Sequence, residues 1–156
     1  DPWNDLLARV ARLGDAVPKE VDMGYHLCYG SMNNRHWKEP DNLGMFVKVI
    51  NELTKQIARP ISFFHVPVPA DRTDDNYYSP LKGIELDPAT QIFLGLLHHA
   101  ESVPGNEHRL LAASKFLDDF GIAMECGLGR RGPRDIVNIL ELHAQVSQQV
   151  HKSVPR

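Results

Sequence analysis

The chain has 156 residues, of which 42% are hydrophobic and 24% are charged, and its formal net charge is -3. This length allows one packed core, so we expect a single domain over residues 1–156. The small net charge and the scattered basic residues do not indicate a nucleic-acid partner. The longest apolar run, Ile92–Leu97, is too short to cross a bilayer, and the first residues lack the features of a signal peptide. We therefore expect a cytoplasmic protein with no membrane partner.

The first half of the chain predicts two helices and two strands. A helix is expected over Asp1–Gly14, because apolar residues recur at helical spacing after an N-cap and a proline. The apolar and aromatic stretch Val21–Tyr29 predicts a buried strand, and the polar stretch Ser31–Asp41 predicts a loop. Leu43–Ala58 has one apolar face and predicts an amphipathic helix, after which Ile61–Val66 predicts the second strand.

The second half continues the alternation of strands and helices. The stretch Ala70–Pro88 is irregular and contains a possible short helical segment. A third strand is expected over Gln91–Leu97 and a helix over Glu107–Phe120. The fourth strand is expected over Ile122–Leu128, and Pro133 opens the last helix.

The predicted order is therefore one helix followed by four strand–helix units. Strands that are apolar throughout and alternate with amphipathic helices are typical of a parallel sheet covered by helices. Four such units make either a small open α/β sheet or half of an eight-stranded (β/α)₈ barrel, and composition and periodicity do not separate the two.

Every predicted strand ends in a residue that can bind a metal ion. Functional side chains of parallel α/β proteins collect at the carboxyl ends of the strands, so we expect these residues to lie near one another. In chain order they are His26 and Cys28, His65, His98 and His99, and Cys126.

The pair His26 and Cys28 has the spacing of two side chains on one face of a strand, so both could bind one ion. Zinc prefers sulfur and nitrogen ligands, which Cys126 and further strand ends could supply. Without a signal peptide, reduced thiols are favoured over a disulfide. The alternative interpretation is structural, because an isolated cysteine is most often a small core residue and a lone strand histidine most often a hydrogen-bonded one.

Four segments of the sequence resemble the last four strands of cobalamin-independent methionine synthase, within the methionine synthase and uroporphyrinogen decarboxylase-like superfamily. They are YHLCYG (Tyr25–Gly30), FFHVPVP (Phe63–Pro69), LGLLHH (Leu94–His99) and ECGLGRR (Glu125–Arg131). The resemblance covers most of the chain, and its most specific parts are the His-x-Cys strand and the Cys-Gly-Leu turn. It implies that the chain forms the C-terminal half of a (β/α)₈ TIM barrel.

The resemblance also implies a zinc site. In this family a His-x-Cys pair, an acidic residue on the next strand and a cysteine on the last strand hold zinc, which activates a substrate thiol to accept a methyl group from a folate. By this resemblance the ligands here would be His26, Cys28 and Cys126. His65 stands where the family has its acidic ligand and would be the fourth, which leaves a His₂Cys₂ site.

The third strand of the family carries residues that bind substrate and deliver a proton. By resemblance, His98 and His99 are the candidate catalytic residues of this chain. A complete barrel needs about 250 residues, and four strands would leave two unpaired edges. We therefore expect either a fragment of a longer barrel protein, or a chain that associates with itself or with a complementary half-barrel.

Three functions remain open at this point. The first is a zinc-dependent, methionine-synthase-like methyltransferase that acts on a small-molecule thiol, with a folate as a possible methyl donor. The second is a metal-free decarboxylase or lyase on the same barrel, for which Arg72, Arg130 and Arg131 would hold a polycarboxylate. The third is a non-catalytic module that zinc stabilises.

Overall fold

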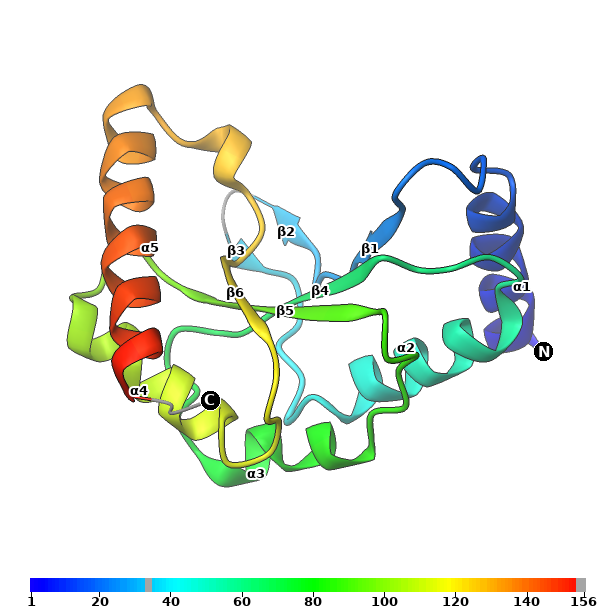
Figure 1. The fold of residues 1–156 in the computed structure, drawn as a ribbon, viewed down its shortest axis with the longest axis horizontal. Coiled ribbons are helices and arrows are strands. Elements are labelled where there is room, and N and C mark those ends of the chain that lie inside the picture. The colour runs from blue at the N-terminus through cyan, green and yellow to red at the C-terminus, as the bar shows by residue number, and fades with distance from the viewer. Residues whose placement is uncertain (33–34, 154–156) are drawn as a thin grey trace.

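The computed structural model describes residues 1–32 and 35–153 and shows a mixed α/β fold (Figure 1). The prediction of a mixed α/β chain is therefore confirmed. The elements, in chain order, are α1 (Pro2–Asp15), β1 (Gly24–His26), β2 (Ser31–Met32), β3 (Arg35–His36), α2 (Gly44–Gln56), β4 (Phe63–Pro67), α3 (Asp75–Tyr78), the 3-10 helix η1 (Ser79–Gly83), β5 (Gln91–Leu97), α4 (Val103–Ala113), β6 (Gly121–Met124), the 3-10 helix η2 (Leu128–Arg130) and α5 (Pro133–Ser153).

The four predicted strands form one parallel sheet in the order β1-β4-β5-β6. In its register His26 pairs with His65, and His65 pairs with Phe93. Figure 1 shows α2 and the α3–η1 segment along one side of the sheet, with α1 and α5 at its two ends. Parallel strands need crossover connections, which the helices between them supply. The parallel arrangement of the sheet is thus as predicted.

β1 and β6 are shorter than predicted, and this places the cysteines after the strands instead of on them. β1 ends at His26, although the backbone N–H of Leu27 still donates to the carbonyl of His65 at 2.9 Å. Cys28 therefore follows the strand. β6 likewise ends at Met124, so that Cys126 lies two positions beyond it.

Other segments of the chain also differ from the prediction. The predicted loop Ser31–Asp41 contains the short antiparallel pair β2–β3. Helix α4 begins at Val103 and ends at Ala113, earlier than predicted at both ends. Its first turn contains a proline, whose fixed φ and missing N–H suit the start of a helix.

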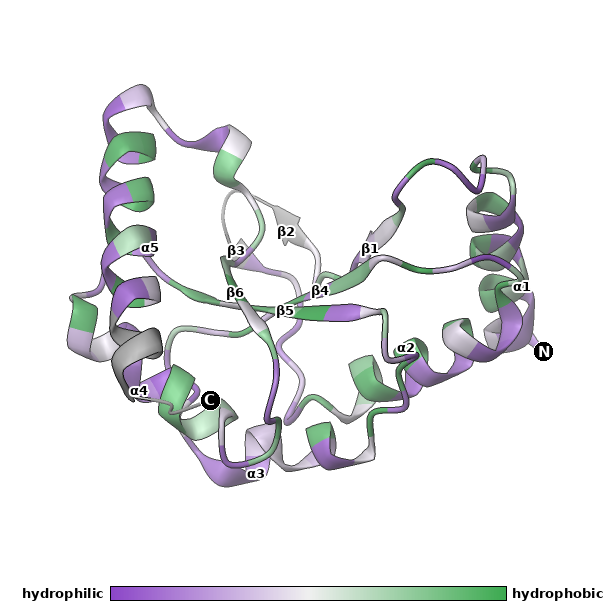
Figure 2. Cartoon of the chain, viewed as in Figure 1, coloured by the Kyte–Doolittle hydropathy of each residue, from purple (hydrophilic) through white to green (hydrophobic). Residues whose placement is uncertain are grey.

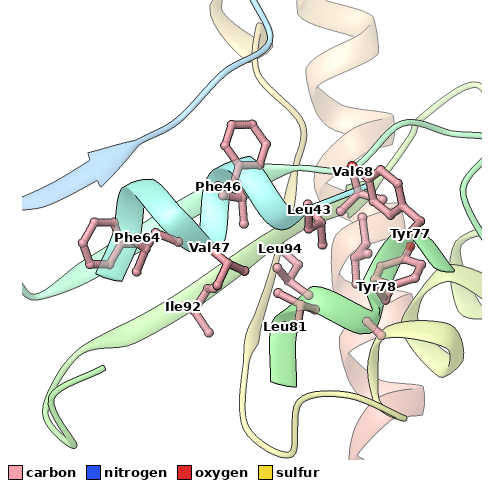
Figure 3. Close-up of a cluster of buried hydrophobic side chains, with 14 of the residues drawn as sticks. Leu43, Phe46, Val47, Phe64, Val68, Tyr77, Tyr78, Leu81, Ile92 and Leu94 are labelled. Carbon is pink, nitrogen blue, oxygen red and sulfur yellow. The ribbon is translucent and has the colours of Figure 1, made fainter. Parts of the chain in front are cut away.

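The hydrophobic core lies between the sheet and the helices beside it. Side chains of the β4 and β5 strands alternate, so that Phe64 is fully buried while Phe63 keeps 38% of its surface exposed. The apolar face of α2 packs against this buried side, as Figure 3 shows. The cluster drawn there includes Leu43, Phe46, Val47, Phe64, Val68, Tyr77, Tyr78, Leu81, Ile92 and Leu94.

A buried arginine connects the carboxyl end of β5 to the chain around it. Arg109 on α4 is 1% exposed, and its guanidinium donates to the carbonyls of Leu96 and Ala70 and to the side chain of Glu101. It also donates to Asn106, whose amide oxygen accepts from the backbone N–H of the residue after β5. Buried charges are tolerated when they are paired and fully hydrogen-bonded, so this network holds the end of β5 in place.

Helices α1 and α5 are amphipathic but carry some apolar residues on their outer surfaces. Figure 2 shows hydrophobic and hydrophilic residues alternating along α5. Ile139 and Val146 are buried, whereas Val137 and Leu140 are exposed. In α1, Leu13 is 73% exposed. Within the described parts of the chain, no helix is both long and apolar enough to cross a membrane.

Candidate metal centre

Three of the predicted ligands lie together. A side-chain nitrogen of His26 and the sulfur atoms of Cys28 and Cys126 are all within 4.8 Å of one another. The two sulfur atoms are 3.3 Å apart, and both cysteines are free thiols. Two thiols and one imidazole form a donor set that suits zinc and other thiolate-binding metals. The arrangement can therefore hold a metal ion.

The cluster joins the two outer strands of the sheet. Cys28 follows β1 and Cys126 follows β6, with β4 and β5 between them. Three strand spacings of about 4.8 Å would separate the outer strands of a flat sheet by roughly 14 Å. The sulfur atoms are nevertheless 3.3 Å apart. Curvature of the sheet and the turns after its outer strands therefore bring the carboxyl ends of β1 and β6 toward each other.

A glycine in the left-handed region follows each thiol. Gly30 has a φ of 77° and lies two positions after Cys28, and Gly127 has a φ of 103° and directly follows Cys126. Residues with a side chain rarely adopt positive φ, so glycine is the residue expected at both positions. The Gly127 carbonyl then accepts from the backbone of Arg130, which begins the tight turn of η2.

Burial and the second thiol raise the pKa of Cys28 above its ordinary value. Burial is the largest cause, followed by the hydrogen bond to Cys126, while a backbone hydrogen bond from Gly30 and the charge of Arg130 act in the opposite direction. Either sulfur atom can be the donor of the hydrogen bond that joins the two thiols at 3.3 Å. A divalent ion at this position would favour the thiolate forms.

His65 lies beside the three-residue cluster. Its Nδ1 is 2.8 Å from Nδ1 of His26, the two rings are stacked with centroids 4.7 Å apart, and its Nε2 is 2.9 Å from the carbonyl oxygen of Met124. The pKa values of His26 and His65 are both lowered, and burial is the largest cause in each case. The set of donors within 4.8 Å of one another does not include His65. Its role as a fourth ligand stays a prediction.

The predicted catalytic histidines occupy two different environments after β5. His98 is 8% exposed, and its Nε2–H donates to the carbonyl of Val68 at 2.7 Å. Its Nδ1 lies 3.6 Å from Oε1 of Glu125. Burial lowers the pKa of His98, although the Glu125 carboxylate opposes this shift. His99 is half-buried and directly follows it.

Glu125 is the residue of the site that the sequence analysis did not single out. Its Oε2 lies 3.1 Å from Nε2 of His36, while Nδ1 of His36 lies 2.6 Å from Oε1 of Glu39. The His36 ring thus lies between the two carboxyl groups. Glu125 thus joins the β2–β3 segment to the end of β6 and faces His98. The sequence feature that could have predicted Glu125 is its position directly before Cys126. Neighbouring side chains of an extended chain point to opposite sides.

Gly95 allows β6 to approach β5 beside His65. A Cβ atom at this position would lie 3.0 Å from both the Cα atom of Glu125 and the carbonyl oxygen of Met124, and 3.1 Å from Nε2 of His65. The β5–β6 register shifts between Leu94 and Leu97, which brackets this glycine. The absence of a side chain therefore lets the Met124 carbonyl reach the His65 ring.

Comparison of the chain with protein-family models and with curated proteins gives no match.

Proposed function

We propose that the chain is a zinc-dependent, methyltransferase-like protein that acts on a small-molecule thiol. The observation that supports the proposal most directly is the convergence of His26, Cys28 and Cys126 from the two outer strands of the sheet. Catalytic zinc sites typically use three protein ligands and keep one position for water or substrate, whereas structural sites use four. A three-donor set is therefore the composition expected of a site that binds a substrate thiol.

The proposed reaction transfers a methyl group to sulfur. Zinc held by the three ligands would lower the pKa of the substrate thiol, so that it is a thiolate at neutral pH. The thiolate sulfur forms a bond to the methyl carbon, the bond between that carbon and a donor nitrogen breaks, and the nitrogen takes up a proton. His98 and His99 are the proposed proton donors. The Glu125 carboxylate, 3.6 Å from Nδ1 of His98, supports its part because it opposes the lowering of the His98 pKa by burial.

A half-barrel is the architecture we propose for this chain. The strand order β1-β4-β5-β6, with parallel neighbours throughout, is that of four consecutive strands of a barrel. The convergence of the two thiols supports a curved sheet over a flat one. A folate as methyl donor rests on the resemblance to cobalamin-independent methionine synthase, as does the expectation that a second half-barrel, or a second copy, completes the binding surface.

The metal-free decarboxylase or lyase has less support at Arg72. That alternative needs arginines available for a polycarboxylate. The guanidinium of Arg72 instead donates to the carbonyl of Pro40, lies 3.5 Å from the carboxylate of Asp74 and covers the ring of Tyr77. These contacts indicate a structural role for Arg72.

Metal analysis and cobalt substitution test the proposal. Protein purified without added metal is expected to contain about one zinc per chain, and Cys28→Ser or Cys126→Ser is expected to lose it. The visible absorption of cobalt-loaded protein should then change when homocysteine is added. Metal-free protein with two freely titratable thiols would reject the site. A bound metal whose absorption spectrum does not change when a thiol is added would instead favour the non-catalytic, zinc-stabilised module.

A further inference from the structure

The contact between His65 and Met124 determines where His65 carries a proton. Nε2 of His65 lies 2.9 Å from the Met124 carbonyl oxygen. A carbonyl oxygen only accepts hydrogen bonds, so Nε2 must be the protonated nitrogen. A neutral imidazole has one N–H, which leaves Nδ1 of His65 with a lone pair. That nitrogen faces Nδ1 of His26 at 2.8 Å.

The proton of His26 follows from that of His65. Two nitrogens at 2.8 Å make a hydrogen bond only if one of them donates. Because Nδ1 of His65 accepts, Nδ1 of His26 donates, and the nitrogen of His26 that keeps a lone pair is Nε2. A metal ion binds only an unprotonated nitrogen. Nε2 is therefore the atom of His26 available to an ion in the cluster with Cys28 and Cys126.

We propose that His65 is a positioning residue that fixes the tautomer and orientation of His26, and that it does not bind the metal itself. We call this series of contacts the relay. It runs from the Met124 carbonyl through the His65 ring and then the His26 ring to the ion. The inference rests on the proposed metal centre and deepens it. It assigns the fourth coordination position to the substrate thiol, because no second imidazole fills it.

Two features of the fold hold the relay together. His26 and His65 are direct neighbours in the β1–β4 register, so their rings emerge side by side. Gly95 lets β6 come close enough for its Met124 carbonyl to reach the ring. The relay thus links β1, β4 and β6, which include the two outer strands that the cysteines follow. Metal-bound histidines commonly donate their second N–H to a partner that sets their orientation, and His65 supplies that partner here.

X-ray absorption spectroscopy of the zinc-loaded wild-type protein gives the first test. One imidazole and two sulfur ligands per zinc are expected, with the remaining position taken by solvent or by an added thiol. Two imidazoles per zinc would overturn the relay and make His65 a ligand, while the proposed function would stand. Failure of the wild-type protein to bind zinc would instead reject the proposed function.

The variant His65→Gln separates positioning from coordination. Loss of an outer partner typically weakens metal binding 10- to 100-fold. We therefore expect a rise of roughly that size in the zinc Kd, with one zinc still bound at saturation and with the ligand-field bands of the cobalt form retained. A loss of zinc as complete as in His26→Ala would overturn the proposal, as would an unchanged Kd.

The matched control is His143→Gln. Nε2 of His143 also contacts a β6 carbonyl, that of Ile122 at 3.1 Å, but His143 is not in the cluster. Its replacement should leave the zinc Kd unchanged, and a shift equal to that of His65→Gln would show a general loss of β6 packing rather than a relay.

Nitrogen NMR of the metal-free, reduced wild-type protein reads the tautomers without any variant or metal. The expected pattern is a proton on Nδ1 of His26 and on Nε2 of His65. A proton on Nε2 of His26 would overturn the relay whether or not the chain binds zinc.

Discussion

The sulfur atoms of Cys28 and Cys126 lie 3.3 Å apart although 98 positions separate the two residues in the chain. They follow the two outer strands of a four-stranded sheet, so an ion that both thiolates bind would join the first and last strands directly. Metal binding and folding of the sheet should therefore be linked energetically.

Removing the metal should lower the melting temperature of the wild-type protein. An ion present at about 1,000 times its Kd stabilises the folded state by about 4 kcal/mol. For a chain of this size that corresponds to a fall of roughly 8–16 °C in Tm when a chelator is added. Calorimetry under reducing conditions measures the change. The double variant Cys28→Ser with Cys126→Ser should not respond to the chelator, and a chelator-insensitive wild type would contradict the prediction.

Cys28 should be alkylated slowly in the metal-free protein at neutral pH. Burial and the hydrogen bond to Cys126 raise its pKa, so a smaller fraction is thiolate at any given pH than for an ordinary cysteine. Mass spectrometry after timed iodoacetamide treatment over a pH series gives the rates. Cys126→Ala removes both the hydrogen bond and the second negative charge, and it should shift the rate profile of Cys28 toward lower pH. A profile that moves the other way would refute the assignment.

The metal-free protein should lose stability as the pH falls below about 6.5. The pKa of His98 is lowered in the folded state by burial, so the unfolded chain takes up its proton first. Stability therefore decreases between the unfolded value of about 6.5 and the folded value, by at most about 1.4 kcal/mol per pH unit for one group. Denaturant titrations from pH 7.5 to 5 measure the slope.

The variant His98→Gln tests which group causes that slope. Glutamine keeps an N–H that can donate to the Val68 carbonyl but does not titrate. The acid-induced loss should be smaller in this variant than in the wild type. An identical slope would assign the effect to other groups, such as His26 and His65, whose pKa values are also lowered.

Glu125→Gln should destabilise the chain more than Glu39→Gln. Both carboxylates contact His36, but the side chain of Glu125 is 19% exposed and that of Glu39 is 46% exposed. A hydrogen bond to a charged group that is largely buried contributes about 1.5–3 kcal/mol, and an exposed ion pair about 0–1 kcal/mol. Urea unfolding of the two variants compares them directly. Equal losses of unfolding free energy in the two variants would show that the Glu125–His36 contact contributes no more to stability than the Glu39–His36 contact.

The isolated chain should associate with itself. Among the described residues, β1 and β6 are the outer strands of the sheet, and apolar side chains such as Leu13 on α1 and Leu140 on α5 are 73% and 56% exposed. Light scattering after gel filtration should show a dimer or larger species, which Leu13→Lys with Leu140→Lys converts to a monomer. Leu111→Lys on α4, at a residue that is 51% exposed, is the control. A monomeric wild type with a cooperative melt would contradict the half-barrel proposal.

The predictable parts of the fold are those with strong local patterns. The strand Gln91–Leu97 agrees with β5 at both ends, because an apolar run between polar residues marks a buried strand. Helix α5 begins at Pro133 as expected, since proline suits the first turn. The start of α4 was missed because Val103 precedes the region where its apolar spacing becomes regular.

The candidate site was predictable where it depends on strand order alone. His26 and Cys28 lie at the carboxyl end of β1 and Cys126 lies at that of β6, and the carboxyl ends of parallel strands share one edge of the sheet. The contacts of His65 and Glu125 depend instead on cross-strand register and on the shift between Leu94 and Leu97, which leave no trace in local spacing. A shift of one residue in such a pairing changes which carbonyl an imidazole reaches.

The space beside Gly95 has a consequence for the evolution of this chain. A side chain at this position would meet the β6 backbone and the His65 ring at once. The two positions are therefore not independent, and in related sequences we expect them to vary together. Where histidine occupies the place of His65, glycine should accompany it on the next strand. This pair offers a criterion for recognising further chains that share the centre.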